Sequence, residues 1–234
     1  MSGRENILNR VRAAVARPAP KLFERDEPPH GTVPQFLPVG DGFEAMRNRL
    51  AEELTALRGE FFAAADGREA NAKLRELVAR FEFKNVVAQD TPEMRCLLHE
   101  IPVKWLGDDY HHTGTESDAA KFETARGGIA LDGFDLAVTH CDALVARLGS
   151  VVLTAKSAGG RALSVLPPNH LVVARREQLV ADLSDALALL RKKYGVRLPS
   201  FITVTTGPSR TSDIEKMLVL GAHGPKKLFV MVVG

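Results

Sequence analysis

Short apolar runs alternate with amphipathic segments in this chain, and this alternation restricts the fold more than any other feature. Residues 43–57 carry apolar side chains at helical spacing, the pattern stops at Gly59, and the short run "EFFAAA" follows. A second helical pattern over residues 74–81 is followed by "NVVAQD" and then by Thr91-Pro92, which has the form of a helix N-cap with proline at the first helical position. Because strands that alternate with helices form parallel sheets covered on both faces, the pattern predicts an α/β fold.

The later part of the chain predicts a mixed, mostly parallel sheet flanked by helices. Two of the expected strands, "GSVVLTA" and "RALSVL", are joined by "KSAGG" and are expected to form a hairpin. A mixed sheet is therefore expected. A helix is predicted over residues 177–194, with its leucines on one face and Gly195 as its cap. The strands are expected at "FDLAVTH", "GSVVLTA", "RALSVL", "HLVVA", "FITVTT" and "LFVMVV".

An N-terminal helix and a proline-rich linker precede the α/β region. Ser2 and Glu5 form a capping-box pattern, and apolar residues at helical spacing follow until Pro18. Six of the thirteen prolines lie between residues 18 and 38, a composition typical of an extended linker. We therefore predict residues 1–41 as a helical arm with a linker, suited to docking on its own domain or on a partner, and residues 42–234 as one α/β domain.

Composition argues against several classes of function. A net charge of +2 and an aromatic content of 6% give no support for binding to nucleic acid. No apolar run approaches the roughly 20 residues of a membrane span, and the N-terminus lacks the apolar core of a signal peptide, so a soluble, cytoplasmic protein is expected. Cys96 and Cys141 are too few for an iron–sulfur cluster or a structural zinc site, and we predict two core thiols with no metal and no cofactor on this chain.

The stretch "TTGPSRTSDIEKML" is the strongest candidate for a ligand site, because it predicts a strand, a glycine turn and a helix. Gly207 provides the turn, and Ser209, Thr211 and Ser212 add hydroxyl groups. Arg210 is able to clamp a carboxylate or a phosphate with two hydrogen bonds. Since a helix N-terminus at the end of a strand favours anions, these residues predict an anion-binding loop.

The same residues also fit a helix that is merely well capped. Ser212 and Glu215 form a capping box, and Asp213 complements the helix dipole while repelling an anion nearby. Farther along, His223 precedes Gly224 in "GAHGP" and is a candidate acid or base near neutral pH, although a lone histidine in a loop is more often only a turn residue. The residue types leave both interpretations open.

Several stretches resemble the lactate-utilisation protein C family, whose domain is called the LUD domain. The most specific are "GPSRTSDIE" and the later "GAHGP", supported by "LSVLPPNHLVV" and by the opening "SGRENILNRVRAAV". The likeness covers the N-terminal helix and most of residues 130–234. It implies a fold similar to the glucosamine-phosphate deaminase, ribose-phosphate isomerase and coenzyme A transferase group.

This resemblance also implies a function. The chain is expected to be an accessory component of a system that oxidises L-lactate to pyruvate, with iron–sulfur oxidoreductase-type proteins as partners that carry the clusters. A crevice at the 207–212 loop and Gly224 then binds a small carboxylate or phosphate ligand. In that site Arg210 is the expected anion clamp, His223 the expected proton carrier and Asp213 a second acid–base candidate.

Two alternatives remain open at this point. The first is a free-standing enzyme acting on a phosphosugar- or acyl-type substrate, with Asp213, Glu215 or His223 as acid–base groups. The second is a non-catalytic assembly protein for iron–sulfur oxidoreductase partners.

One departure from the family pattern bears on specificity. Relatives carry a small or hydroxyl residue before the glycine of the loop within "DLAVTHCDALVARLGSVVL", a segment expected to form strand, helix and strand. This chain has Leu148 before Gly149, and Arg147 before that. If this loop faces the ligand crevice, Leu148 removes a hydrogen-bonding group, Arg147 adds a charge, and the substrate changes.

Overall fold

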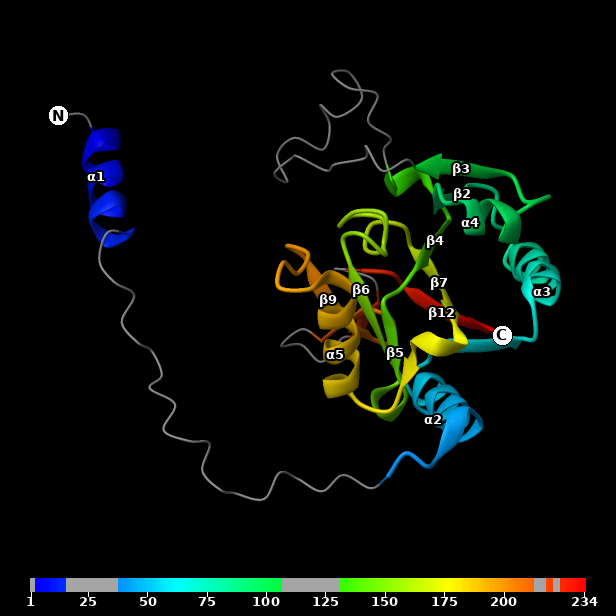
Figure 1. Cartoon of the computed structure of the whole chain (residues 1–234). Helices are drawn as coiled ribbons and strands as arrows, with labels where there is room; N and C mark the ends of the chain where they lie inside the picture. The colour runs from blue at the N-terminus through cyan, green and yellow to red at the C-terminus, as the bar shows by residue number, and fades with distance from the viewer. Residues whose placement is uncertain (1–2, 16–37, 107–130, 213–217, 221–223) are drawn as a thin grey trace. The chain divides into compact units, whose positions relative to one another are not determined.

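The computed structural model describes residues 3–15, 38–106, 131–212, 218–220 and 224–234 (Figure 1). The chain divides into two units between Leu37 and Pro38. The first unit contains helix α1 (Gly3–Val15), and the second contains every other described element. No helix within the described ranges is long and apolar enough to cross a membrane.

The second unit is built on a six-stranded sheet in the order β1-β12-β7-β4-β2-β3. Every neighbouring pair in this sheet is parallel. The predicted α/β class with a mostly parallel sheet is therefore confirmed. The strands are β1 (Glu60–Ala64), β2 (Val86–Gln89), β3 (Val103–Leu106), β4 (Leu136–His140), β7 (Asn169–Arg175) and β12 (Lys227–Val233).

Helices cover both faces of this sheet, because successive side chains of a strand point to opposite faces. Helices α3 (Gly67–Arg80) and α4 (Pro92–Leu97) pack on the face that holds Leu171 and Phe229. Helix α2 (Gly42–Ala56) packs on the other face, which holds Val172 and Val230. As predicted, Thr91 caps α4, its hydroxyl accepting a hydrogen bond from the Met94 N–H at 3.1 Å.

A smaller sheet packs with α2 on the second face of the main sheet. Its order is β8-β5-β6-β9, and it is mixed, since β5 and β8 are parallel while the other pairs are antiparallel. Helix α5 (Leu183–Tyr194) packs against it through Ala186 and Leu190. The strands are β5 (Ala143–Val145), β6 (Ser150–Thr154), β8 (Leu179–Val180) and β9 (Ile202–Thr206).

Three predictions of local structure in the middle of the chain were wrong. The helix expected before Gly149 is strand β5 followed by the 3-10 turn η3 (Ala146–Leu148), because Ala143–Val145 is fully buried between β8 and β6. The strand expected at residues 161–166 is a series of turns, so the expected hairpin does not form. The helix expected from residue 177 begins at Leu183, where the Asp185 carboxylate accepts a hydrogen bond from the Asp182 N–H.

The helix expected after the 207–212 loop is also corrected. Residues Arg210–Ser212 form strand β10, which pairs antiparallel with β11 (Leu218–Leu220). The Leu-Val-Leu run thus pairs with a second strand instead of continuing a helix. The described part of this loop consequently has no helix N-terminus to attract an anion.

Candidate functional site

A crevice of about 500 Å³ lies where three adjacent strands of the main sheet end. Gln89 ends β2, His140 ends β4 and Arg175 ends β7, and all three line the crevice. β4 and β2 are neighbours in the main sheet. The next main-sheet strand after β2 is β3, on the far side of β2, whereas the next one after β4 is β7, on the far side of β4, so the chain continues in opposite directions from the two strands. Ligands of open α/β sheets bind at such reversal points, outside the carboxyl ends of the strands. We call this site the carboxyl-edge crevice.

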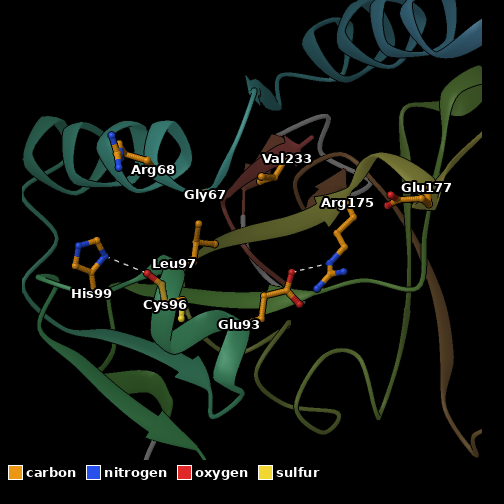
Figure 2. Close-up of a pocket in the computed structure, with 9 residues that line it drawn as sticks. All are labelled: Gly67, Arg68, Glu93, Cys96, Leu97, His99, Arg175, Glu177 and Val233. Atoms are coloured by element: carbon orange, nitrogen blue, oxygen red, sulfur yellow. Dashed lines mark hydrogen bonds and ion pairs between the residues drawn. The ribbon is translucent and has the colours of Figure 1, made fainter.

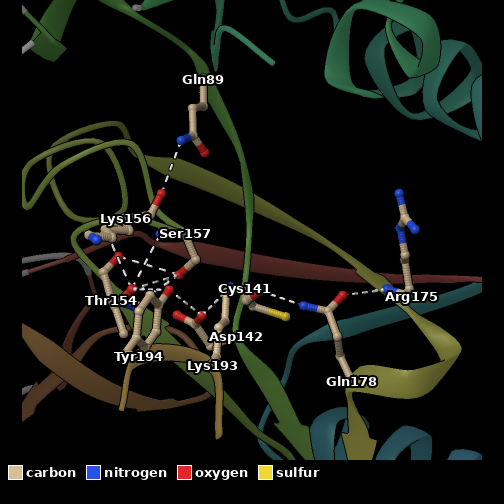
Figure 3. Close-up of polar contacts among 10 residues, drawn as sticks. All are labelled: Gln89, Cys141, Asp142, Thr154, Lys156, Ser157, Arg175, Gln178, Lys193 and Tyr194. Carbon is tan, nitrogen blue, oxygen red and sulfur yellow. Dashed lines mark hydrogen bonds and ion pairs between the residues drawn. The ribbon is translucent and has the colours of Figure 1, made fainter. Parts of the chain in front are cut away.

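The turn that follows β6 brings a lysine to this crevice (Figure 3). Ser157 is buried, and its hydroxyl accepts a hydrogen bond from the Thr154 N–H at 2.9 Å, which holds the turn. The Gln89 side-chain amide donates to the Lys156 carbonyl at 3.0 Å. The Lys156 ammonium lies 5.5 Å from the centre of the Tyr194 ring and has no ion pair with any carboxylate in the described part of the chain. Lys156 is therefore a cation that is available to an anionic ligand.

Gln89 also presents an acceptor that has no partner among the described residues. The residue is 7% exposed, and its side-chain oxygen is buried without a hydrogen bond from the described chain. A buried acceptor without a donor costs about 1–3 kcal/mol. A hydroxyl or N–H group of a ligand would supply that donor.

His140 is the imidazole of the crevice and is largely buried. Its Nε2 lies 3.3 Å from the Thr91 hydroxyl and 3.8 Å from a Glu93 carboxylate oxygen. Burial lowers the pKa of His140, although the Glu93 charge opposes this effect. The ring is therefore neutral at pH 7 and able to accept a proton or a hydrogen bond.

Glu93 and Arg175 form an ion pair at the border of the crevice, with 2.8 Å between Arg175 Nε and Glu93 Oε1. The hydrogen bond from Arg175 lowers the pKa of Glu93, so the carboxylate is charged. Both side chains are exposed to solvent, Arg175 by 63% and Glu93 by 42%, and such pairs contribute little to stability. The guanidinium can therefore exchange Glu93 for a ligand carboxylate at small cost.

Asp142 neutralises the second lysine of the crevice. Its side chain is 1% exposed, and its Oδ1 accepts hydrogen bonds from Lys193 Nζ and the Tyr194 hydroxyl, each at 2.7 Å. Burial by itself would raise the pKa of Asp142, but the hydrogen bonds from Lys193 and Tyr194 outweigh burial and lower it. This pairing leaves Lys156 as the cation without a carboxylate partner in the described part of the crevice.

Neither cysteine has the features of a nucleophile in this site. Cys141 lines the crevice but is buried, and burial raises the pKa of its thiol. Cys96 is exposed, so the prediction of two core thiols is correct for Cys141 and wrong for Cys96. Among the described residues, no group of three His, Cys, Asp or Glu side chains is placed to hold a metal ion.

The structure brings together part of the loop predicted from the sequence. The Ser209 N–H donates to the Pro225 carbonyl at 2.8 Å, and a Cβ placed on Gly224 would lie 3.2 Å from the Ser209 Cβ. Gly207 has φ of +83° and packs against Leu57, next to the end of α2. Arg210 donates a hydrogen bond to the Leu57 carbonyl, so its guanidinium is already bound to the protein.

This loop lies at the other end of β6 from the lysine turn. Thr206, just before the loop, pairs with Ser150 at the start of β6, whereas Lys156 and Ser157 follow the end of that strand. Asp213 and His223 lie outside the described residues. Thr211 and Ser212 are placed by their backbone in β10. Ligand binding by the 207–212 loop, and the roles of Asp213 and His223, stay predictions.

The turn that contains Leu148 lies beside this loop and not in the carboxyl-edge crevice. The Ser150 hydroxyl is 2.7 Å from the Thr206 hydroxyl, and Leu148 is 39% exposed. Arg147 pairs with Asp182, with 2.9 Å between Nη2 and Oδ2. The charge that Arg147 was expected to add is therefore matched by a carboxylate.

Sequence reasoning missed the residues of the carboxyl-edge crevice, although a signal was present. In "VVAQD", "AVTHCD" and "VLTAKS" a polar residue follows an apolar strand at once. Because the carboxyl ends of parallel strands share one edge, the polar residues that end β2 and β4 lie close together. Lys156 was assigned to a hairpin tip, but the structure places it in a turn after β6 that lines the crevice.

Comparisons with known proteins agree with this architecture. The LUD domain family model matches residues 47–233. The chain is 28% identical to lactate utilization protein C of Shouchella clausii, over all of this chain and 98% of that protein. It is 32% identical to lactate utilization protein C of Bacillus subtilis, over 68% of this chain and 67% of that protein.

One solved structure supports the fold alone. A DUF162 family protein from Deinococcus radiodurans superposes with a TM-score of 0.58 at 18% identity, covering 83% of this chain and all of that one. The family match spans nearly the whole second unit, including both sheets and the carboxyl-edge crevice. The chain belongs to the LUD domain family.

Proposed function

We propose that this chain takes part in lactate utilisation, and that its carboxyl-edge crevice binds a small hydroxy- or keto-carboxylate of the lactate and pyruvate class. The relatives named lactate utilization protein C, aligned along their full length, support the pathway. The observations that carry the binding proposal are that Lys156, a cation without a carboxylate partner among the described residues, and Gln89, whose buried side-chain oxygen lacks a donor, both line the crevice. A hydroxy carboxylate carries both complementary groups, a charge for the lysine and a hydroxyl donor for the amide.

In this proposal each group of the crevice has one task. Lys156 binds the carboxylate, and Gln89 accepts the hydrogen bond of the ligand hydroxyl while its amide holds the Lys156 backbone. His140, neutral and beside Thr91, is the group placed to accept a proton. We assign the two electrons released when L-lactate becomes pyruvate to iron–sulfur oxidoreductase-type partners, so this chain acts as their accessory component.

Thermal unfolding of the purified chain with candidate ligands tests the binding. A ligand present at a hundredfold its dissociation constant adds about 2.7 kcal/mol, which raises Tm by roughly 5–10 °C for a domain of this size. We expect such a shift with L-lactate or pyruvate, and a loss of at least about tenfold in affinity for Lys156→Ala, because one charge-assisted contact contributes about 1.5–3 kcal/mol. Phosphate and phosphosugars belong in the same panel, since a shift with them alone would favour the phosphosugar enzyme.

The matched control is Lys84→Ala. Lys84 is an exposed lysine just before β2, at the opposite end of the strand from Gln89, and its removal should leave the shift intact. A shift that survives Lys156→Ala but disappears in Arg210→Ala would place the site at the 207–212 loop. No shift with any carboxylate would refute binding by this chain alone.

We also propose that α1 is the surface on which a partner protein docks. Ile7 and Leu8 are 63% and 41% exposed on this helix, and exposed apolar side chains of this kind mark interaction sites when they gather on one face. The proline-rich segment that follows, residues 18–38, provides a linker between such a docking helix and the second unit.

A further inference from the structure

A second pocket, of about 540 Å³, adjoins the carboxyl-edge crevice (Figure 2). Glu93 and Arg175 line both cavities, and Figure 2 shows the two side chains turned towards one another. The second pocket extends from this ion pair to Gly67 at the start of α3 and to Val233 at the end of β12. We call it the adjoining pocket.

The adjoining pocket has an apolar floor. Leu97 belongs to the hydrophobic core beneath it, Val233 packs against that core, and Cys96 contributes a thiol. Five ionisable side chains complete its lining: Arg68, Glu93, His99, Arg175 and Glu177. A cavity that offers apolar surface beside polar groups is a usual form of a site for an organic ligand.

The size of the two cavities exceeds what lactate needs. L-lactate has about six non-hydrogen atoms, and at roughly 30 Å³ each, a water's share of liquid volume, it takes up about 180 Å³. The carboxyl-edge crevice alone is about 500 Å³. A ligand that fills the crevice and continues past the ion pair is therefore larger than lactate and carries apolar atoms.

The ion pair between the cavities does not prevent such a ligand from passing. Arg175 and Glu93 are both exposed, so their pairing is weak, and the Arg175 guanidinium can bind a ligand oxygen in place of Glu93. We propose that the two cavities form one site for a 2-hydroxy or 2-keto carboxylate with an extended apolar side chain. The carboxylate end lies in the crevice near Lys156, and the apolar chain lies on the floor of the adjoining pocket. This inference rests on the function proposed above.

Calorimetric titration with L-lactate and with 2-hydroxytetradecanoate, whose roughly 17 non-hydrogen atoms exceed the volume of the crevice, tests the inference. Each buried methylene group tightens binding roughly fourfold, so the added methylenes of the longer acid should tighten it by more than about tenfold. Gly67→Leu should abolish this gain while leaving the affinity for L-lactate unchanged. The reason is that Gly67 lines the adjoining pocket and a Cβ there meets no atom within 4 Å, so a leucine is accommodated without a clash and takes up space at the pocket wall.

Gly133→Leu is the matched control, because a Cβ at that exposed position also meets nothing within 4 Å. It should keep the full preference for the longer acid. Equal affinities for the two acids in the unaltered chain, or a preference that survives Gly67→Leu, would overturn the two-part site and leave lactate binding intact. Failure of both acids to bind would instead refute the proposed function itself.

Discussion

At the scale of single residues, His170 shows how burial sets the charge of a side chain in the core. It is 1% exposed within β7, and its Nε2 lies 2.8 Å from the Thr139 hydroxyl. Its Nδ1 is buried and has no hydrogen-bond partner among the described residues. Burial lowers the pKa of His170 to about 3, so the folded protein holds this ring neutral through mildly acidic conditions.

This shift predicts a loss of stability in acid. Between pH 6.5, the usual histidine pKa, and about pH 3, the unfolded chain binds a proton at residue 170 that the folded chain does not bind. The contribution of His170 is thus complete above pH 6.5 and declines as the pH falls, by up to about 1.4 kcal/mol per unit. Urea unfolding at pH 7, 6, 5 and 4 should show a shallower decline for His170→Leu. Substitution of the exposed His99 by leucine serves as the control. If the free energy of unfolding of His170→Leu declined with falling pH as steeply as that of the unaltered chain, the lowered pKa of His170 would be contradicted.

At the scale of elements, two glycine turns fix helix α2 against the smaller sheet. Gly149 follows η3 with φ of +61°, and a Cβ there would lie 2.8 Å from the Glu53 Cβ and 2.9 Å from the Leu54 N. Gly207 after β9 has φ of +83°, and its Cβ would lie 3.0 Å from the Leu57 Cβ. Both turns require the left-handed backbone and the close approach that only glycine allows.

Gly149→Ala should therefore destabilise the protein by about 2–4 kcal/mol, from the left-handed backbone and from the contact with α2. Gly133→Ala, at a position with ordinary φ and open space, should stay within about 0.5 kcal/mol of the unaltered chain. The free energy of unfolding from urea titration measures both. Similar values for the two variants would show that α2 does not depend on this turn.

At the scale of the whole molecule, the hydrophobic core of the described chain lies entirely within residues 38–234. Every buried hydrophobic residue of the described chain lies between Leu50 and Val232, and all four hydrophobic clusters lie in this unit. We therefore predict that the arm is dispensable for this core, and that the exposed Ile7 and Leu8 of α1 are available to a partner.

Deletion of residues 1–37 should consequently change Tm by less than about 2 °C relative to the full chain. A change of that size corresponds to less than about 1 kcal/mol for a domain of this length. The same deletion should weaken co-purification with the iron–sulfur partner proteins proposed above. Circular dichroism measures the first effect and affinity capture the second. A fall in Tm of more than about 5 °C would show that the arm stabilises the second unit, and undiminished capture would refute α1 as the docking surface.

Most of the main sheet was predictable from the sequence, whereas the site was not. β1, β2, β4, β7 and β12 coincide with apolar runs of near-continuous β-forming residues. The smaller sheet was harder to predict from the sequence. β5 is three residues long and β8 is two, and such short strands form only because they pair with neighbouring strands. The 207–212 loop attracted a site prediction through its residue types, but Arg210 bonds to Leu57, and residues 210–212 and 218–220 pair as strands where a helix was expected.

The sequence by itself determined the α/β class, the caps at Thr91 and Gly195, and the family, because these depend on periodicity and on local residue order. Only the tertiary structure decided the order of the strands and, with it, which polar residues meet. Gln89, His140, Lys156 and Arg175 are spread over 87 positions of the chain and converge because β2, β4 and β7 are neighbours and the β6 turn reaches their edge. Such long-range pairing depends on which apolar faces bury together, a choice that no local stretch of sequence encodes.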